Sequence, residues 1–105
     1  MPVPENSGEH FTVICSDAIA ESLLKLQREA TSTKQTGAIA SAFAEIVEQL
    51  RRHARTAGEA NYNLTSLHLQ VRTCAIAPLA VNYAVHEERP LVFIKGVKLL
   101  PRRGS

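Results

Sequence analysis

Two stretches in the first half of the chain carry apolar residues at the spacing of a helix. The stripes are Ile19, Leu23, Leu26 and Ala30 in the first stretch, and Ile39, Phe43, Ile46 and Leu50 in the second. Residues three or four apart lie on one face of a helix. Ser16 and Asp17 are typical of a helix start, and Gly58 is a natural end for the second helix. The pattern therefore predicts a helical hairpin with one buried face.

Strand patterns precede and follow this hairpin. Residues 10–16, HFTVICS, form a short apolar and β-branched run. Residues 67–74 and 79–86 alternate with period two, and residues 91–100, LVFIKGVKLL, are apolar at both parities. A run apolar at both parities indicates a central strand that is buried on both faces. Residues 59–66 lack such a pattern and are expected to form a loop.

These elements predict an α+β domain of order β-α-α-β-β-β. The helical hairpin should pack on one face of a four-stranded, mostly antiparallel sheet, leaving the other face partly open. A chain of 105 residues has room for one core, which we place at residues 10–100. Residues 1–9, MPVPENSGE, are expected to be a flexible tail, and residues 101–105 a short basic C-terminal tail.

No apolar run approaches the roughly 20 residues of a membrane span, and the start of the chain has no signal-peptide pattern. We therefore expect a cytoplasmic protein without membrane contact. Cys15 and Cys74 sit in apolar stretches and are expected to be small buried hydrophobic residues. The sequence has no cluster typical of a metal site, and no cofactor is expected.

The net charge of +2 hides an uneven distribution. Residues 1–50 carry three Lys or Arg against seven Asp or Glu, whereas residues 51–105 carry nine against three. Charge-driven binding is therefore expected in the C-terminal half. Three arginines, Arg51, Arg52 and Arg55, fall at the end of the second helix, where they suit the helix dipole and could also grip an acidic partner.

Polar side chains also recur on the strand parities that should face away from the helices. They are His68, Gln70, Arg72, Asn82 and His86. Lys95 and Lys98 belong to the last strand, where the doubly apolar pattern leaves their facing open. A sheet face with Arg, Lys and His could bind phosphate or RNA, although such residues also serve simply to solvate a sheet. Tyr83 falls in the apolar register, so a core tyrosine with a solvated hydroxyl is favoured.

No catalytic signature is present. The chain has no glycine-rich phosphate loop, no nucleophile elbow and no zinc-protease motif. The acidic pair Glu87-Glu88 falls in a predicted hairpin turn, where a solvated turn is favoured over a general base.

The order of elements and several stretches together resemble the RelE/ParE superfamily of toxins from type II toxin–antitoxin systems. The stretches are residues 11–13, Ala18 and Ala20 in the first helix, Ile39, Ala42, Ile46 and Leu50 in the second, Gly58-Glu59, and residues 78–85 leading through an acidic turn to residues 91–97. The resemblance covers about residues 10–100. It implies a cognate antitoxin as partner, one that wraps the protein with a helix or strand, and it implies that the first strand is inserted beside the last.

The family also implies one of two targets: RelE-like members cut mRNA on the ribosome, and ParE-like members bind DNA gyrase. Ribonuclease members usually have an arginine where this chain has Ala80, Val81 and Asn82, and a His or Tyr after the last strand, where this chain has residues 99–103, LLPRR. Cleavage needs a proton acceptor for the 2′-hydroxyl and positive charge on the phosphate. The catalytic candidates that remain are Arg72, His86 and Lys95, with His68 as another acid or base.

The leading hypothesis is therefore a protein with this toxin fold that acts by binding, with ribonuclease activity either absent or vestigial. Its expected contact residues are Arg51, Arg52, Arg55, His68, Arg72, Lys95 and Lys98. The second hypothesis is a ribosome-dependent mRNA endonuclease with displaced catalytic residues. The third is an unrelated α+β interaction domain, for which a homodimer is expected.

Overall fold

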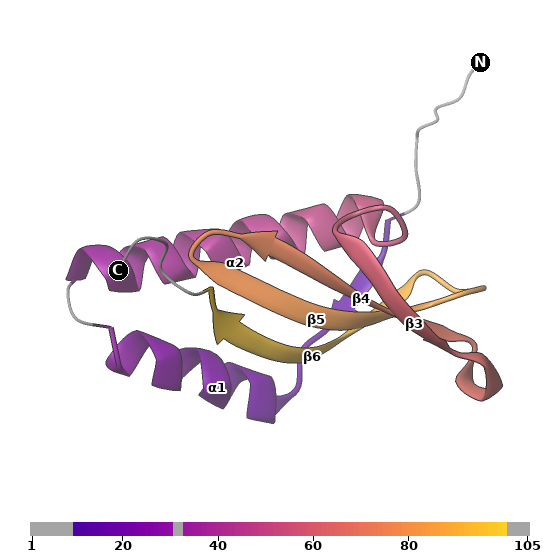
Figure 1. Ribbon diagram of the computed structural model, residues 1–105, viewed down its shortest axis with the longest axis horizontal. Coiled ribbons are helices and arrows are strands. Elements are labelled where there is room, and N and C mark those ends of the chain that lie inside the picture. Colours follow the sequence, from indigo (N-terminus) through magenta and orange to yellow (C-terminus); the bar gives the residue numbers. More distant parts are fainter. Residues whose placement is uncertain (1–9, 31–32, 101–105) are drawn as a thin grey trace, which may run out of the picture.

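In the computed structural model, which describes residues 10–30 and 33–100, a short strand leads into two helices and four further strands follow (Figure 1). The elements are β2 (Thr12–Ile14), α1 (Asp17–Arg28), α2 (Thr33–His53), β3 (Glu59–Leu64), the 3₁₀ turn η1 (Thr65–Leu67), β4 (Leu69–Ile76), β5 (Leu79–His86) and β6 (Leu91–Leu99). The fold is thus α+β, as expected. The tails expected at 1–9 and 101–105 lie outside the described residues.

Both predicted helices are present, with their apolar stripes toward the sheet. Ser16 caps α1, because its hydroxyl oxygen accepts a hydrogen bond from the backbone amide of Ile19 at 3.3 Å. The residues of α2 that are fully buried against the sheet are Ile39, Ile46 and Leu50. The expected end of α2 is wrong: the helix ends at His53, and Gly58 closes the turn that follows.

The sheet has five strands in the order β2-β6-β5-β4-β3, so the expected four-stranded sheet is wrong. The additional strand is β3, in residues that were expected to be a loop. It pairs antiparallel with β4 through a bulge between Ala60 and Tyr62. Its residues are exposed except for the half-buried Leu64, because it is an edge strand outside the core. An edge strand of this kind lacks the apolar alternation that marks a strand in the sequence.

The first strand lies beside the last, the position that the family resemblance implies. β2 pairs with β6 in parallel, with Thr12 opposite Leu91 and Ile14 opposite Phe93. The other pairs are antiparallel, so the sheet is mixed. In the view of Figure 1, α2 runs above and α1 below the strands β5 and β6, and the far end of β3, with η1, extends beyond both helices.

The helices and one face of the sheet enclose the core. On β5 the core side chains are Leu79, Val81, Tyr83 and Val85, and each is at most 1% exposed. Val92 and Ile94 of β6 belong to the same core. The expected burial of β6 on both faces holds only in part, since Leu91 and Phe93 on the other parity are half-buried.

The facing expected for β4 is wrong. Arg72 lies opposite Tyr83 in the antiparallel register, and residues paired in this way share a face, so Arg72 and Gln70 are on the helix side. Val71 and Thr73 occupy the open face instead. Alternation identifies β4 as a strand but does not say which parity meets the helices. A second expectation also fails, because Cys15 is exposed beyond the end of β2, whereas Cys74 is buried as expected.

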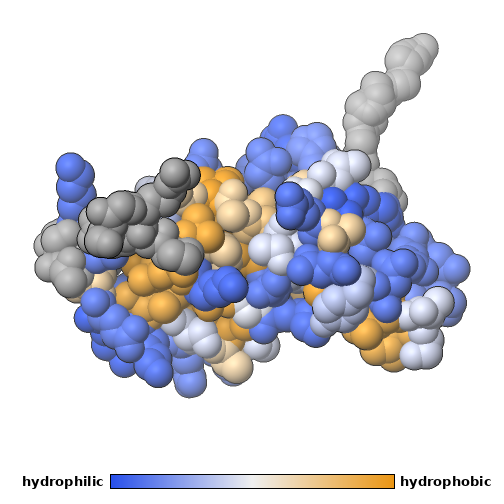
Figure 2. All heavy atoms as spheres, in the orientation of Figure 1, coloured by the Kyte–Doolittle hydropathy of each residue, from blue (hydrophilic) through white to orange (hydrophobic). Residues whose placement is uncertain are grey.

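Figure 2 shows hydrophobic residues gathered between the helices and the adjoining ends of the strands, with hydrophilic residues around them and a second hydrophobic spot at η1. The large apolar side chains that remain exposed are Ile14, Leu24, Tyr62 and Leu67. Ile14 and Tyr62 lie opposite Phe93 and Val71, so they flank the open face of the sheet from its two edges.

Candidate functional site

Arg72 and Tyr83 hold the turn that connects α2 to β3. The Arg72 guanidinium donates hydrogen bonds to the carbonyl oxygens of Ala57 at 3.0 Å and Gly58 at 3.3 Å, and to the side-chain oxygen of Gln70 at 2.8 Å. The Tyr83 hydroxyl lies 2.9 Å from the carbonyl oxygen of Ala54 and 2.8 Å from that of Ala57. These carbonyls lie just beyond the last turn of α2 and need donors once they are buried. Arg72 is only 8% exposed, and its role is structural.

Tyr83 is the core tyrosine that the sequence predicts, but its hydroxyl is bound to protein and not to solvent. Burial raises the pKa of Tyr83 above its ordinary value, while the hydrogen bond and positive charge of Arg72 act in the opposite direction. Burial likewise raises the pKa of the Cys74 thiol. Both groups are therefore neutral near pH 7, and neither is activated for chemistry.

Gly58 is required where the turn meets β4. Its φ is +63°, a conformation that residues with a side chain rarely adopt, and a Cβ at this position would overlap the carbonyl group of Thr73. The close approach brings the carbonyls of the turn within reach of Arg72. The whole arrangement therefore depends on one glycine and one buried cation.

The three arginines at the end of α2 have different surroundings. Arg52 pairs with Glu48 one turn earlier, at 2.9 Å, and both side chains are exposed. The Arg55 guanidinium lies 4.9 Å from the centre of the Phe11 ring and donates to the carbonyl oxygens of His86 and Arg89. Arg51 is exposed and lines a groove beside β2. All three were expected as contact residues; the side chains of Arg51 and Arg52 are exposed, whereas Arg55 is half-buried beside Phe11 and the turn after β5.

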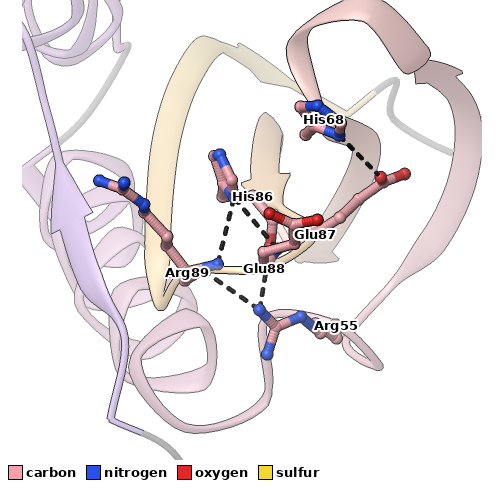
Figure 3. A network of polar contacts seen from close by, with 6 residues as sticks. All are labelled: Arg55, His68, His86, Glu87, Glu88 and Arg89. Carbon is pink, nitrogen blue, oxygen red and sulfur yellow. Dashed lines mark hydrogen bonds and ion pairs between the residues drawn. The ribbon is translucent and has the colours of Figure 1, made fainter.

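Figure 3 shows how the turn between β5 and β6 is built around His86. The His86 Nδ1 atom accepts hydrogen bonds from the backbone amides of Glu88 and Arg89, each at 3.1 Å. Arg55 crosses from the end of α2 to the two carbonyls of the same turn at 3.0 and 3.1 Å. His86 thus acts as the cap of a turn, and Nδ1, one of its two ring nitrogens, is already occupied.

His68 lies beside this turn, after η1. Its ring centre is 6.3 Å from that of His86, and its Nδ1 is 3.9 Å from a carboxylate oxygen of Glu87. The backbone amide of Glu87 donates to the His68 carbonyl oxygen at 2.8 Å. Glu87 therefore belongs to this cluster. It lies in the turn between β5 and β6, where the sequence predicts a hairpin turn. The sequence did not predict that His68, His86 and Arg55 would meet there.

Lys95 and Lys98 present the remaining positive charge of β6, and both are exposed. Lys95 lies at the bulge where the register shifts between Asn82 and Tyr83. It borders a hollow of about 320 Å³ on the open face, together with Asn61, Tyr62, Asn82 and Gly96. In this hollow the Asn82 amide donates to the Thr73 hydroxyl, which lies 3.2 Å from the side-chain oxygen of Asn61.

The structure therefore separates residues that the sequence grouped. Arg72 faces the helices and Lys95 faces the open side, so the two cations lie on opposite faces of the sheet. Asn61 and Tyr62 at the hollow were missed, because β3 was expected to be a loop. Arg89 was missed as well, although its position beside the acidic pair in a predicted hairpin turn was a usable signal.

Two further observations concern membrane-spanning helices and metal ligands among the described residues. Neither α1 nor α2, as far as the structure describes the chain, is long and apolar enough to cross a membrane. Among residues 10–30 and 33–100, no three His, Cys, Asp or Glu side chains come together in a way that could hold a metal ion.

Comparison of the chain with protein-family models, curated proteins and solved structures found no match. The family resemblance therefore rests on the residues and the topology given above.

Proposed function

We propose that this chain is a RelE/ParE-like protein of a toxin–antitoxin module that acts by binding a target, as ParE-like members do, and is neutralised by a cognate antitoxin. The order of the strands supports this proposal: β2 lies beside β6, with the helical hairpin between β2 and the remaining strands in sequence. The topology agrees with the resemblance but does not by itself assign an activity.

The observation that carries the choice of binding over cleavage is the environment of Arg72. A ribonuclease needs a cation that reaches the phosphate as negative charge develops there. The Arg72 guanidinium is instead directed at Ala57, Gly58 and Gln70 on the helix side of the sheet. Bringing it to a phosphate would break its hydrogen bonds to the carbonyl oxygens of Ala57 and Gly58 and leave the former to Tyr83 alone, at a cost of about 1–3 kcal/mol.

The candidate acid or base is also poorly placed. His86 uses Nδ1 to cap the β5–β6 turn, and a base that loses this nitrogen to a proton would lose two hydrogen bonds of the turn. Lys95, on the opposite face from Arg72, cannot share one phosphate with it. The three catalytic candidates of the sequence thus serve separate purposes.

The contact surface of the proposed binding protein is the open face of the sheet, with Lys95 and Lys98 as its charges. Ile14, 41% exposed, and Tyr62, 54% exposed, add apolar area at its two edges. A surface of this composition suits a protein partner with acidic groups. The proposed target is DNA gyrase; the ribosome or mRNA is the target under the endonuclease alternative.

Controlled expression tests the proposal. The protein is induced in bacterial cells without an antitoxin, and growth, mRNA integrity and DNA supercoiling are followed. We expect growth arrest with intact mRNA and gyrase-type DNA damage. Arrest with cut mRNA would establish the endonuclease instead, and unchanged growth would favour a non-toxic interaction domain.

A matched pair of variants tests the surface. Lys95→Glu is expected to abolish the growth arrest, because it reverses a charge at the centre of the proposed surface. Lys25→Glu, which makes the same change on the exposed side of α1, is expected to retain the arrest. Equal toxicity of the two variants at equal protein levels would refute the assignment of Lys95.

A further inference from the structure

The hollow of about 320 Å³ on the open face of the sheet is formed by residues of four strands. The strands β3, β4, β5 and β6 line it with Asn61, Tyr62, Val71, Asn82, Lys95 and Gly96. Gly96 lies opposite Asn82 in the register, and a Cβ at this glycine would have no neighbour within 4 Å. The backbone therefore leaves room beside Asn82 for a small group of a ligand.

A chain of hydrogen bonds fixes the orientation of the amide groups at this hollow. The Nδ2 atom of Asn82 donates to the Thr73 hydroxyl at 2.7 Å, and this hydroxyl donates in turn to the Asn61 Oδ1 atom at 3.2 Å. A hydroxyl group has a single proton to donate, and Thr73 directs it to Asn61. Because Asn61 accepts through its oxygen, its Nδ2 atom retains two N–H groups that this chain of hydrogen bonds does not use.

The charge at the hollow is positive. Lys95 borders it, is exposed, and makes no ion pair within residues 10–30 and 33–100. Glu59, opposite Thr73 in the register, is exposed as well, but neither it nor another Asp or Glu of the described residues lines the hollow. The ammonium group of Lys95 and the Nδ2 atom of Asn61 are both donors, so together they suit an oxyanion.

A row of apolar residues beside the hollow favours a protein as the source of this oxyanion. The pairing registers place Tyr62, Val71, Ala84, Phe93 and Ile14 next to one another across the five strands. Both ends of the row are exposed and Phe93 is half-buried, so a protein that covers the row would bury apolar surface. A nucleic acid backbone needs several cations along its phosphates, and Lys95 is the one cation among the described residues that line the hollow.

We propose that the hollow receives the carboxylate of an Asp or Glu side chain presented by a partner protein. One carboxylate oxygen would accept a hydrogen bond from the ammonium group of Lys95, and the other would accept from the Nδ2 atom of Asn61. Hydrogen bonds to an ionised acceptor are stronger than those between neutral groups. The methylene groups of the acidic side chain would lie against Val71 and the ring of Tyr62.

Thr73 and Asn82 are positioning residues in this proposal, since they act through Asn61. The Thr73 hydroxyl holds the Asn61 oxygen, so that the nitrogen of the same amide is presented to the ligand, and Asn82 holds the Thr73 hydroxyl. The inference rests on the proposed function, whose contact surface is this face of the sheet. It adds the chemical group that the target must present there.

Titration of the full chain with capped amino acids, followed by nuclear magnetic resonance, tests the proposal. The probes are N-acetylglutamate N-methylamide and its neutral counterpart N-acetylglutamine N-methylamide. We expect the glutamate probe to shift the signals of the Asn82 side-chain amide and the Gly96 backbone amide saturably, and the glutamine probe to leave them unchanged. Equal responses to the two probes, or no saturable response to glutamate, would overturn the proposal.

Variants then assign the donors. Lys95→Gln and Asn61→Asp should each bind the glutamate probe at least about fivefold more weakly than the wild type, because each removes a donor to the carboxylate. Asn61→Asp keeps an oxygen that accepts from Thr73, so the hydrogen bonds within the hollow are retained. Lys25→Gln, the same change of charge on α1, should bind as the wild type does. Unchanged binding by Lys95→Gln or Asn61→Asp would refute the site.

The positioning role has its own pair of variants. Thr73→Val removes the hydroxyl but suits a strand, so we expect weaker binding of the glutamate probe, and Thr73→Ser should restore it. Equal binding by Thr73→Val and wild type would contradict this role. Inorganic phosphate is a further probe: tighter binding of phosphate than of the glutamate probe would assign the hollow to a phosphate-bearing ligand and overturn the proposal.

The outcomes separate this inference from the proposed function. Growth arrest with intact mRNA, in the absence of probe binding, would refute the carboxylate site alone. Binding of the glutamate probe without growth arrest would refute the proposed function and support the hollow as a site in a non-toxic interaction domain.

Discussion

The two faces of the sheet use their polar residues in opposite ways. On the helix side Arg72 and Tyr83 are buried, and their polar groups are committed to carbonyls at the end of α2. On the open side Lys95 and Lys98 are exposed and make no ion pair within residues 10–30 and 33–100. A cation in a strand can therefore be part of the scaffold or part of a surface, and only the facing of the strand distinguishes the two.

The largest expected difference in the free energy of unfolding is between substitutions of two glycines, one in the turn held by Arg72 and one on the open face. Gly58→Ala places a side chain against the carbonyl of Thr73 at a positive φ, and we expect it to lower the free energy of unfolding by about 3 kcal/mol. Gly96→Ala, on the open face with nothing within 4 Å of the new Cβ, should change it by less than about 1 kcal/mol. Urea denaturation of both variants measures the difference. Equal losses would contradict the close packing assigned to Gly58.

A smaller difference is expected for the two cations. Arg72→Ala leaves the carbonyls of Ala57 and Gly58 short of a donor, so we expect a loss of about 2 kcal/mol in the free energy of unfolding. Lys95→Ala, which removes an exposed side chain, should cost no more than about 0.5 kcal/mol. If the urea concentration at the midpoint of unfolding is the same for Arg72→Ala and Lys95→Ala, the structural role of Arg72 is refuted.

The smallest effect concerns a single hydroxyl group. Tyr83→Phe removes the hydroxyl proton that the carbonyl oxygens of Ala54 and Ala57 share, and we expect it to cost about 1 kcal/mol near pH 7. Tyr62→Phe, an exposed position on β3, is the matched control and should have no measurable effect on stability.

The same variant tests the effect of pH. The pKa of Tyr83 is raised in the folded state, so the neutral phenol is favoured there. Its contribution is complete below the unfolded pKa of about 10 and is lost as the pH rises toward the folded pKa. The free energy of unfolding of the wild type should therefore fall more steeply above about pH 10 than that of Tyr83→Phe. Parallel curves would contradict the burial of an ionisable phenol.

Much of the fold follows from local patterns. The stripes of α1 and α2 face the core because three- and four-residue spacing leaves one apolar side on each helix. The strands β4 and β5 follow from the alternation, and β6 follows from its run of residues that are apolar at both parities. β3 could not be predicted in this way, because EANYNL is an edge strand that contributes no buried residue.

The candidate site was less predictable. Gln70 and Arg72 were expected on the open face because polar residues in a strand usually face solvent. Arg72 is buried because distant backbone carbonyls, brought near by the turn at Gly58, need its donors. That need arises only in the folded chain and leaves no local pattern. The meeting of Arg55 with the turn after His86 is non-local for the same reason.

The parallel pairing of β2 with β6 has a consequence for the order of folding. Thr12 emerges early from the ribosome, but its partner Leu91 belongs to the last strand described. Contacts so far apart in sequence form late, because the loop between them must close first. During synthesis β2 therefore has no strand beside it while the helical hairpin and β3, β4 and β5 are made. Its pairing with β6 can be completed only after residue 93 has emerged.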